Sequence, residues 1–170
     1  MLQQYRAIRF FIGMITILTV IAAVGCGDKE PATTAPIAPP EIDPQTVPEM
    51  IEIDGVEFTL STYLWRDFMP ITDENGRELA AVVYVATADS SMFPSDISAD
   101  LMWVYYKNDI WGAALENGSQ PDYNFRIKKS ANGGPKWETG ILVDVVVRLI
   151  DDEGKYFYIK ETDVVVERTE

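Results

Sequence analysis

The chain has 170 residues, with 27 acidic and 14 basic side chains, a formal net charge of −13, no histidine and one cysteine. A strongly anionic surface repels phosphate backbones and anionic lipids, so nucleic-acid binding and polybasic membrane docking are disfavoured. Without histidine, Ser-His-Asp triads and histidine-ligated zinc are excluded. A single cysteine also excludes an intramolecular disulfide or a thiolate metal cluster, and we expect no cofactor.

Residues 1–25 have the pattern of a secretory signal peptide. The first ten residues carry two arginines and no acidic residue, and the run from Phe10 to Val24 is almost entirely apolar. This run is shorter than the roughly 20 residues that a transmembrane helix needs, and small residues follow it. The alternative is an uncleaved N-terminal membrane helix in which the cysteine is incidental.

The only cysteine follows this leader directly. The stretch Ala23-Val24-Gly25-Cys26 resembles the lipobox of bacterial lipoproteins cut by signal peptidase II, with Ala23 in place of the more usual leucine. The resemblance implies that Cys26 becomes the acylated first residue of an exported protein anchored in the cell membrane or outer membrane. Acylation also removes the oxidation liability of a lone exported thiol, and two or three acyl chains give stable anchoring.

Residues 26–48 contain the cysteine and a proline-rich stretch that has six of the ten prolines of the chain. Such a composition is typical of a stiff, disordered spacer, and its 22 residues after the cysteine would reach up to ~70 Å if fully extended. The alternative is a proline-rich recognition motif, but no basic residue flanks the prolines. We therefore expect a spacer that holds the following domain away from the membrane.

Residues 49–170 predict one all-β domain. Short runs rich in β-branched and aromatic residues alternate with turn residues, and no long stretch has the apolar spacing of a helix. The candidate strands cover residues 51–53, 56–68, 79–88, 101–107, 110–116, 122–128, 141–150, 155–160 and 163–167. This number of short strands predicts an antiparallel immunoglobulin-like β-sandwich.

Two turn sequences predict the register of hairpins. Asp152-Glu153-Gly154 fits a three-residue loop with glycine in the left-handed position, which places Leu149 opposite Phe157. Asn108-Asp109 fits a two-residue loop, because both residues tolerate positive φ, and it places Tyr106 opposite Trp111. Each register separates an apolar face from a mixed face.

The mixed face of the second hairpin carries Trp103 and Tyr105. Exposed rings above small residues provide a flat surface for a sugar ring, a peptide or a protein partner. The alternative is that loops or another strand cover this face. Trp137 lies in the irregular stretch 130–140 and is a third candidate for the ligand surface, unless it folds onto the sandwich edge as a structural corner.

Clusters of carboxylates raise the possibilities of calcium binding and of glycoside hydrolysis. Asp151-Asp152-Glu153, and Asp96 with Asp100, do not match the calcium-loop pattern, and turn formation explains them without a metal. Hydrolysis needs two carboxylates at a defined separation, which the sequence does not specify. We predict that the protein is not an enzyme and has no metal site.

The C-terminal run from Gly134 to Thr169 resembles the end of small bacterial envelope lipoproteins of uncharacterised role. The resemblance implies an exported sandwich domain and carries over no catalytic or binding residue. The first functional hypothesis is a lipid-anchored binding or assembly module of the cell envelope, with a protein or glycan partner. The alternative hypothesis is a carbohydrate-binding or accessory domain that acts on cell-surface polysaccharide, and a third is a purely structural role in a complex.

Overall fold

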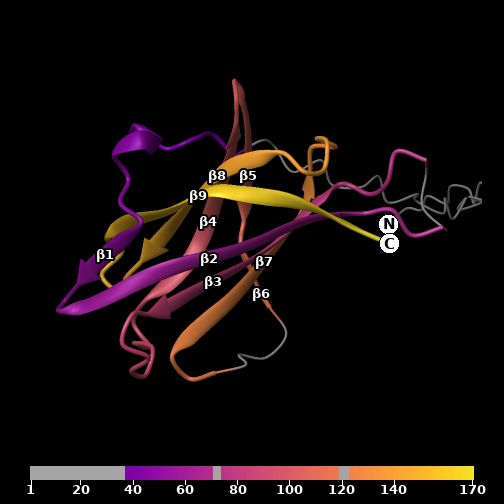
Figure 1. Cartoon of the computed structure of the whole chain (residues 1–170). Helices are drawn as coiled ribbons and strands as arrows, with labels where there is room; N and C mark the ends of the chain where they lie inside the picture. The colour runs from indigo at the N-terminus through magenta and orange to yellow at the C-terminus, as the bar shows by residue number, and fades with distance from the viewer. Residues whose placement is uncertain (1–36, 71–73, 119–122) are drawn as a thin grey trace, which may run out of the picture. The chain divides into compact units, whose positions relative to one another are not determined.

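A computed structural model describes residues 37–70, 74–118 and 123–170 (Figure 1). In these residues the chain forms nine strands and one 3-10 turn, so the predicted all-β class is confirmed. None of their helical segments is long and apolar enough to cross a membrane. Cys26 and the predicted signal peptide lie outside the described residues. The elements are η1 (Pro44–Thr46), β1 (Met50–Ile53), β2 (Val56–Asp67), β3 (Leu79–Thr87), β4 (Ser98–Tyr106), β5 (Asp109–Ala114), β6 (Glu116–Asn117), β7 (Arg126–Gly134), β8 (Leu142–Ile150) and β9 (Tyr156–Thr169).

The strands form one sheet in the order β5-β4-β8-β9-β2-β3-β7-β6, with β1 paired to β2. The sheet is continuous because β9 pairs with β8 over its first part and with β2 over its last four residues (Figure 1). Asp163 has a φ of 56° and marks the irregularity where β9 bends from one partner to the other. The β2–β9 pair is parallel, so the prediction of a purely antiparallel sheet is wrong.

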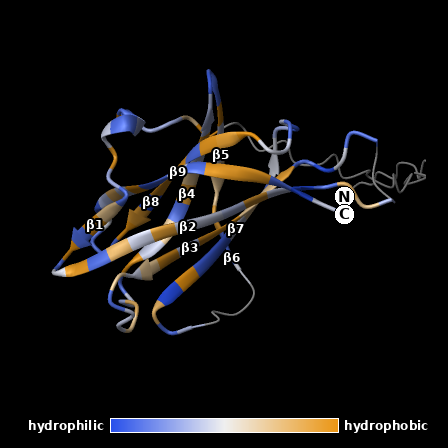
Figure 2. Cartoon of the chain, viewed as in Figure 1, coloured by the Kyte–Doolittle hydropathy of each residue, from blue (hydrophilic) through white to orange (hydrophobic). Residues whose placement is uncertain are grey.

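The core lies between the two groups of strands on either side of this bend. Its fully buried side chains include Phe58 and Leu64 of β2, Met102 of β4 and Ile159 of β9. Successive residues of a strand point to opposite faces, and Figure 2 shows the resulting alternation of hydrophobic and hydrophilic residues along β2. Burial of the apolar face of each strand is the main stabilising term of this domain.

The predicted register of the β8–β9 hairpin is confirmed. Leu149 lies opposite Phe157, and Gly154 has a φ of 81°, the left-handed conformation that the turn requires. The predicted register of the β4–β5 hairpin is wrong by two residues, because Val104 rather than Tyr106 lies opposite Trp111. The turn begins one residue earlier than predicted, at Lys107, which has a φ of 54°.

The stretch 130–140 was expected to be irregular, but β7 continues to Gly134. Its last residues have weak intrinsic strand preference and are held in the sheet by pairing with β3, including Ala81 with Ala131 and Leu79 with Gly134. A Cβ at Gly134 would lie 2.8 Å from both Leu79 and the ring of Trp111. The absence of a side chain at this position therefore lets Trp111 pack over the strand.

Residues 37–48, which we call the strap, do not form the free spacer that the sequence predicts. Val47 is 5% exposed and packs with Trp103 and Val146 of the sheet. The backbone N–H of Lys160 in β9 donates to the carbonyl of Pro48 at 2.9 Å. The predicted boundary at residue 49 is thus wrong for the described part of the spacer, which belongs to the packed domain.

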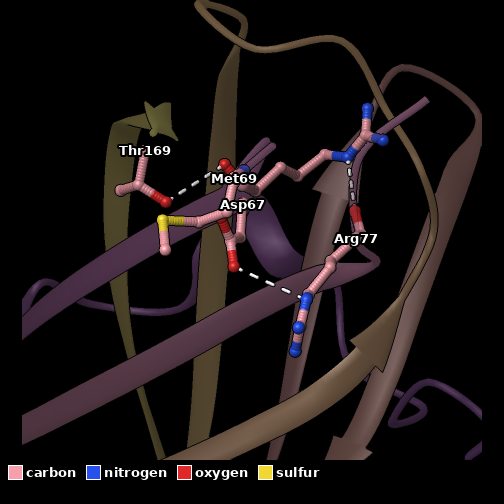
Figure 3. A network of polar contacts seen from close by, with 5 residues as sticks. Asp67, Met69, Arg77 and Thr169 are labelled. Carbon is pink, nitrogen blue, oxygen red and sulfur yellow. Dashed lines mark hydrogen bonds and ion pairs between the residues drawn. The ribbon is translucent and has the colours of Figure 1, made fainter. Parts of the chain in front are cut away.

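Arg66 of β2 fastens two loops to the end of the sheet. It is 3% exposed, and its guanidinium donates to the carbonyls of Asn75, Arg77, Lys136 and Trp137. Two contacts around Arg66 can be followed in Figure 3: a carboxylate oxygen of Asp67 lies 3.5 Å from Nε of Arg77, and the Thr169 hydroxyl donates to the backbone carbonyl of Arg66. Asp67 also accepts a hydrogen bond from the backbone N–H of Met69. The charge of Arg66 is satisfied by backbone oxygens, so its role is structural.

Candidate functional site

The outer face of β4 carries Trp103 and Tyr105, as predicted, but the strap covers it. Trp103 is 2% exposed, and its indole Nε1 donates to the carbonyl of Ala38 at 2.9 Å. Tyr105 is half-buried in the same apolar cluster, and burial raises the pKa of its hydroxyl. The structure therefore matches the alternative in which another part of the chain covers this face, and the covering segment is the one that the sequence predicts to be a spacer.

Gly112 of β5 explains how the strap approaches this face so closely. Gly112 lies directly opposite Trp103 in the sheet. A Cβ added to Gly112 would lie 2.3 Å from the carbonyl oxygen of Ile37, well inside the contact distance of real side chains. The glycine leaves the space in which the strap crosses β5.

Trp137 is the third residue predicted for a ligand surface, and it lies against a different part of the domain. It is partly buried against the main core, and its ring lies 5.5 Å from that of Tyr106. Its carbonyl accepts a hydrogen bond of 2.7 Å from Arg66. These contacts match the structural-corner alternative, and the structure does not bring Trp137 together with the Trp103 cluster.

A groove of about 590 Å³ opens at the other end of the strap, where β1 and the start of β9 diverge. Its lining is mostly apolar and aromatic and comes from three segments of the chain. Tyr156 and Met50 are 51% and 50% exposed within it, so large hydrophobic surfaces remain in contact with solvent. The lining residues are Ile42, Thr46, Val47, Pro48, Met50, Ile51, Glu52, Tyr156, Phe157 and Tyr158.

The β9 side of the groove is an unpaired strand edge. Alternate residues of a strand direct their backbone N–H and C=O groups to the same side, and the N–H of Lys160 points away from β8 to Pro48. The register with β8 is regular from Tyr156 to Lys160, so the backbone groups of Tyr156 and Tyr158 point to the same side. Neither makes a backbone hydrogen bond on that side with any described residue.

The β1 side presents a second edge that pairs with no strand of the described residues. Glu57 directs its carbonyl to the N–H of Ala88, the residue that follows β3, so the β1 residue opposite, Glu52, does not exchange hydrogen bonds with it. By the same alternation, the backbone groups of Glu52 and Met50 point away from β2, toward the groove. The groove therefore combines aromatic walls with backbone donors and acceptors on two sides.

The cations near the aromatic wall are already engaged. The guanidinium of Arg148 lies 4.1 Å from the ring centroid of Tyr156 and forms an ion pair of 2.6 Å with Asp100. The hydrogen bond with Asp100 raises the pKa of Arg148. The ammonium of Lys155 lies 4.6 Å from the ring centroid of Phe157, and both cations support the aromatic wall by cation–π contact.

A smaller hollow of about 240 Å³ adjoins the groove and shares Glu52 with it. The hollow is also lined by Glu57, Asp89 and Ser91. A hydrogen bond with the Ser91 side chain, and a second one of 2.9 Å from the Ser91 backbone N–H, lower the pKa of Asp89. Among the described residues no group of three or more His, Cys, Asp or Glu side chains is arranged to hold a metal ion.

Two of the five carboxylates considered for calcium binding, Asp151 and Asp100, have structural partners. Asp151 accepts from the backbone N–H of Lys155 at 2.8 Å and closes the β8–β9 turn. Asp100 forms two hydrogen bonds with Arg148. Turn formation and ion pairing account for these side chains.

Sequence reasoning did not identify Tyr156, Tyr158 or Met50 as site residues. The signal is the run Tyr156-Phe157-Tyr158, which puts aromatic rings on both faces of one strand, although only one face of the sheet packs on the core. The sequence predicts two strands, residues 155–160 and 163–167, where the structure has the single strand β9, and no local pattern indicates which edge of its first half stays unpaired. No protein-family model, curated protein or solved structure matches this chain.

Proposed function

We propose that the protein is a binding or assembly module of the cell envelope that holds an extended segment of a partner protein in the groove between β1 and β9. The observation that carries the proposal is the unpaired backbone edge of Tyr156 and Tyr158 within an aromatic groove. An extended peptide that adds to such an edge gains main-chain hydrogen bonds, and the groove walls select its side chains. The proposal involves no catalytic step and requires no metal or cofactor.

The groove suits one short strand. Tyr156 and Tyr158 offer two N–H and two C=O groups on one side, and Met50 and Glu52 offer the same number on the other. Each hydrogen bond contributes about 1 kcal/mol net, so pairing alone gives weak binding. The partly exposed rings supply the apolar area that would raise the affinity to the micromolar range.

We further propose that the domain is an immunoglobulin-like sandwich. The order β2-β3-β7-β6 on one side and β5-β4-β8-β9 on the other supports this, because it has the arrangement A-B-E-D and C′-C-F-G of that class. In such folds the loops and the free edges of the sheets carry the binding sites. The groove lies at one of these edges.

The proposed location is outside the cell, with a lipid anchor at Cys26. Ten residues separate Cys26 from the strap, and fully extended they would span at most about 35 Å. Because the strap is packed on the domain, the greatest distance between the domain and the membrane is about half of the ~70 Å that a free 22-residue spacer would allow. Metabolic labelling with a clickable palmitate analogue tests the anchor: Cys26→Ser is expected to abolish labelling, and unchanged labelling would overturn it.

The groove proposal is tested with an array of immobilised ten-residue peptides of random sequence, probed with the full chain in detergent. Tyr156→Pro removes the groove-facing N–H at the first residue of the strand, whereas Tyr156→Ala removes only the ring. We expect the proline variant to lose at least about tenfold in affinity and the alanine variant less, since it keeps the hydrogen bond. Equal binding of the wild type and the proline variant, or no retained peptide, would refute the proposal.

The outer face of β2 favours a second candidate function, contact with a cell-surface glycan. Tyr63 is 46% exposed, and its ring stacks on that of Trp65 with a centroid distance of 5.3 Å. Exposed rings bind the apolar faces of sugars. A glycan array with Tyr63→Ala, and with Tyr156→Ala in the groove as a control at a residue that is 51% exposed, separates this function from peptide binding: only the first variant is expected to lose a sugar signal.

A further inference from the structure

We propose that the segment bound in the groove carries a cationic residue two positions from an apolar one. This inference rests on the proposed peptide-binding function and assigns the chemical class of the partner segment. It follows from the charge of the β1 side of the groove and from the alternation of side chains along an extended chain.

The β1 side is uniformly acidic. Residues 37–57 include six carboxylates and no lysine or arginine. All six are exposed, and none forms an ion pair with another described residue. The six are Glu41, Asp43, Glu49, Glu52, Asp54 and Glu57.

The cations on the opposite side offset only part of this charge, because the six carboxylates outnumber them. Arg148 is paired with Asp100, Lys155 lies over Phe157, and the ammonium of Lys160 donates to the carbonyl of Gln45 at 3.1 Å. Each is held by a partner other than the six carboxylates. A segment entering the groove therefore meets a field that favours positive charge.

The position of the cation follows from the two adjoining hollows. Met50 and Glu52 are two residues apart on β1, so their side chains emerge on the same face. Met50 lines the apolar groove, whereas Glu52 lines both the groove and the acidic hollow with Glu57 and Asp89. A strand lying along β1 places an apolar side chain at Met50 and, two positions away, a lysine or arginine at Glu52.

The test uses three fluorescein-labelled ten-residue peptides that share one apolar residue. They differ only at the position two residues after it, which is lysine, glutamine or glutamate. Binding to the full chain in detergent is measured by fluorescence anisotropy at low and high salt. We expect the order lysine, glutamine, glutamate, with about a two- to fivefold step at each substitution, as for an exposed ion pair. High salt should reduce the difference, because exposed charges are screened.

Glu52→Gln is expected to remove the preference for lysine, so that the variant binds the lysine and glutamine peptides with equal affinity. Glu153→Gln removes a carboxylate from the exposed β8–β9 turn and serves as the matched control, with the preference retained. Equal affinity for the three peptides would overturn the charge assignment and leave peptide binding intact. Absence of binding to all three, together with an empty random array, would overturn the peptide-binding function itself.

Discussion

Replacing Gly112 with alanine should lift the strap from the sheet. The added Cβ would lie 2.3 Å from the Ile37 carbonyl oxygen, about 1.1 Å short of the 3.4 Å at which ordinary contact begins. The neighbouring residue, Ala38, accepts the hydrogen bond from Trp103 Nε1. A displacement of this size at Ile37 cannot leave a 2.9 Å bond to the adjacent carbonyl in place.

The expected cost combines two terms. Losing the Trp103 hydrogen bond costs about 1 kcal/mol, and overpacking at a close backbone contact costs about 1–3 kcal/mol. The strap packs on one face of the domain and not in the main core. It can therefore detach locally, which limits the overpacking cost. We therefore expect the free energy of unfolding to fall by about 2 kcal/mol, measured by urea denaturation with circular dichroism.

The structural part of the prediction is read from the indole N–H signals of the four tryptophans in ¹H–¹⁵N spectra. Trp103→Phe identifies the Trp103 signal, which should shift and exchange faster with solvent in Gly112→Ala. Gly118→Ala is the control, because its nearest atom is the flexible Lys128 side chain at 2.9 Å. An unchanged Trp103 signal in a folded Gly112→Ala protein would refute the strap contact.

Three further substitutions test other parts of the structure. Arg66→Met leaves the loop carbonyls that Arg66 binds without donors and should lower the free energy of unfolding in urea by about 3 kcal/mol. Arg77→Met removes an exposed ion pair and should lower it by less than about 1 kcal/mol. Equal losses would contradict a structural role of the Arg66 hydrogen bonds. Burial, with a smaller effect of Glu49, raises the pKa of Glu161 above 4.5, so ionisation destabilises the fold as pH rises from about 4.5 through the folded pKa. Glu161→Gln should flatten the pH dependence of the unfolding midpoint and raise it near neutral pH, and a parallel profile would argue against burial as the cause. Gly154→Ala should lower the free energy of unfolding in urea by about 1 kcal/mol because of the backbone φ of 81° alone, since nothing lies within 4 Å of the new Cβ. Gly154→Asn should lower it less, because asparagine tolerates the left-handed conformation better than alanine.

Local sequence was sufficient for most of the strands and for the faces of the two predicted hairpins, but not for the end of β7 or for the continuity of β9. The β8–β9 register was predictable because Gly154 confines the left-handed residue of the turn to one position. The predicted β4–β5 register differs from the observed one by two residues, because Lys107 adopts positive φ, although Asn108 and Asp109 have the higher intrinsic tolerance for it. The faces were still assigned correctly, because a shift of two residues preserves the side on which each side chain lies.

The local sequence does not predict the contacts between distant segments that define the candidate site. Composition marked residues 26–48 as a spacer, and nothing local to them shows that Val47 meets Trp103 or that Gly112 leaves room for Ile37. The parallel pairing of β2 with the end of β9 joins residues about a hundred positions apart, so no turn sequence specifies it.

The amino-acid sequence by itself therefore determined the all-β class, the apolar faces and the exclusion of histidine-dependent chemistry, because these depend on residue identity and on a period of two. Only the tertiary structure decided which faces remain open. The strap covers the aromatic face of β4, whereas the divergence of β1 from β9 exposes the backbone of Tyr156 and Tyr158. Whether a face is covered or open depends on contacts between segments that are distant in sequence, and local sequence patterns do not specify such contacts.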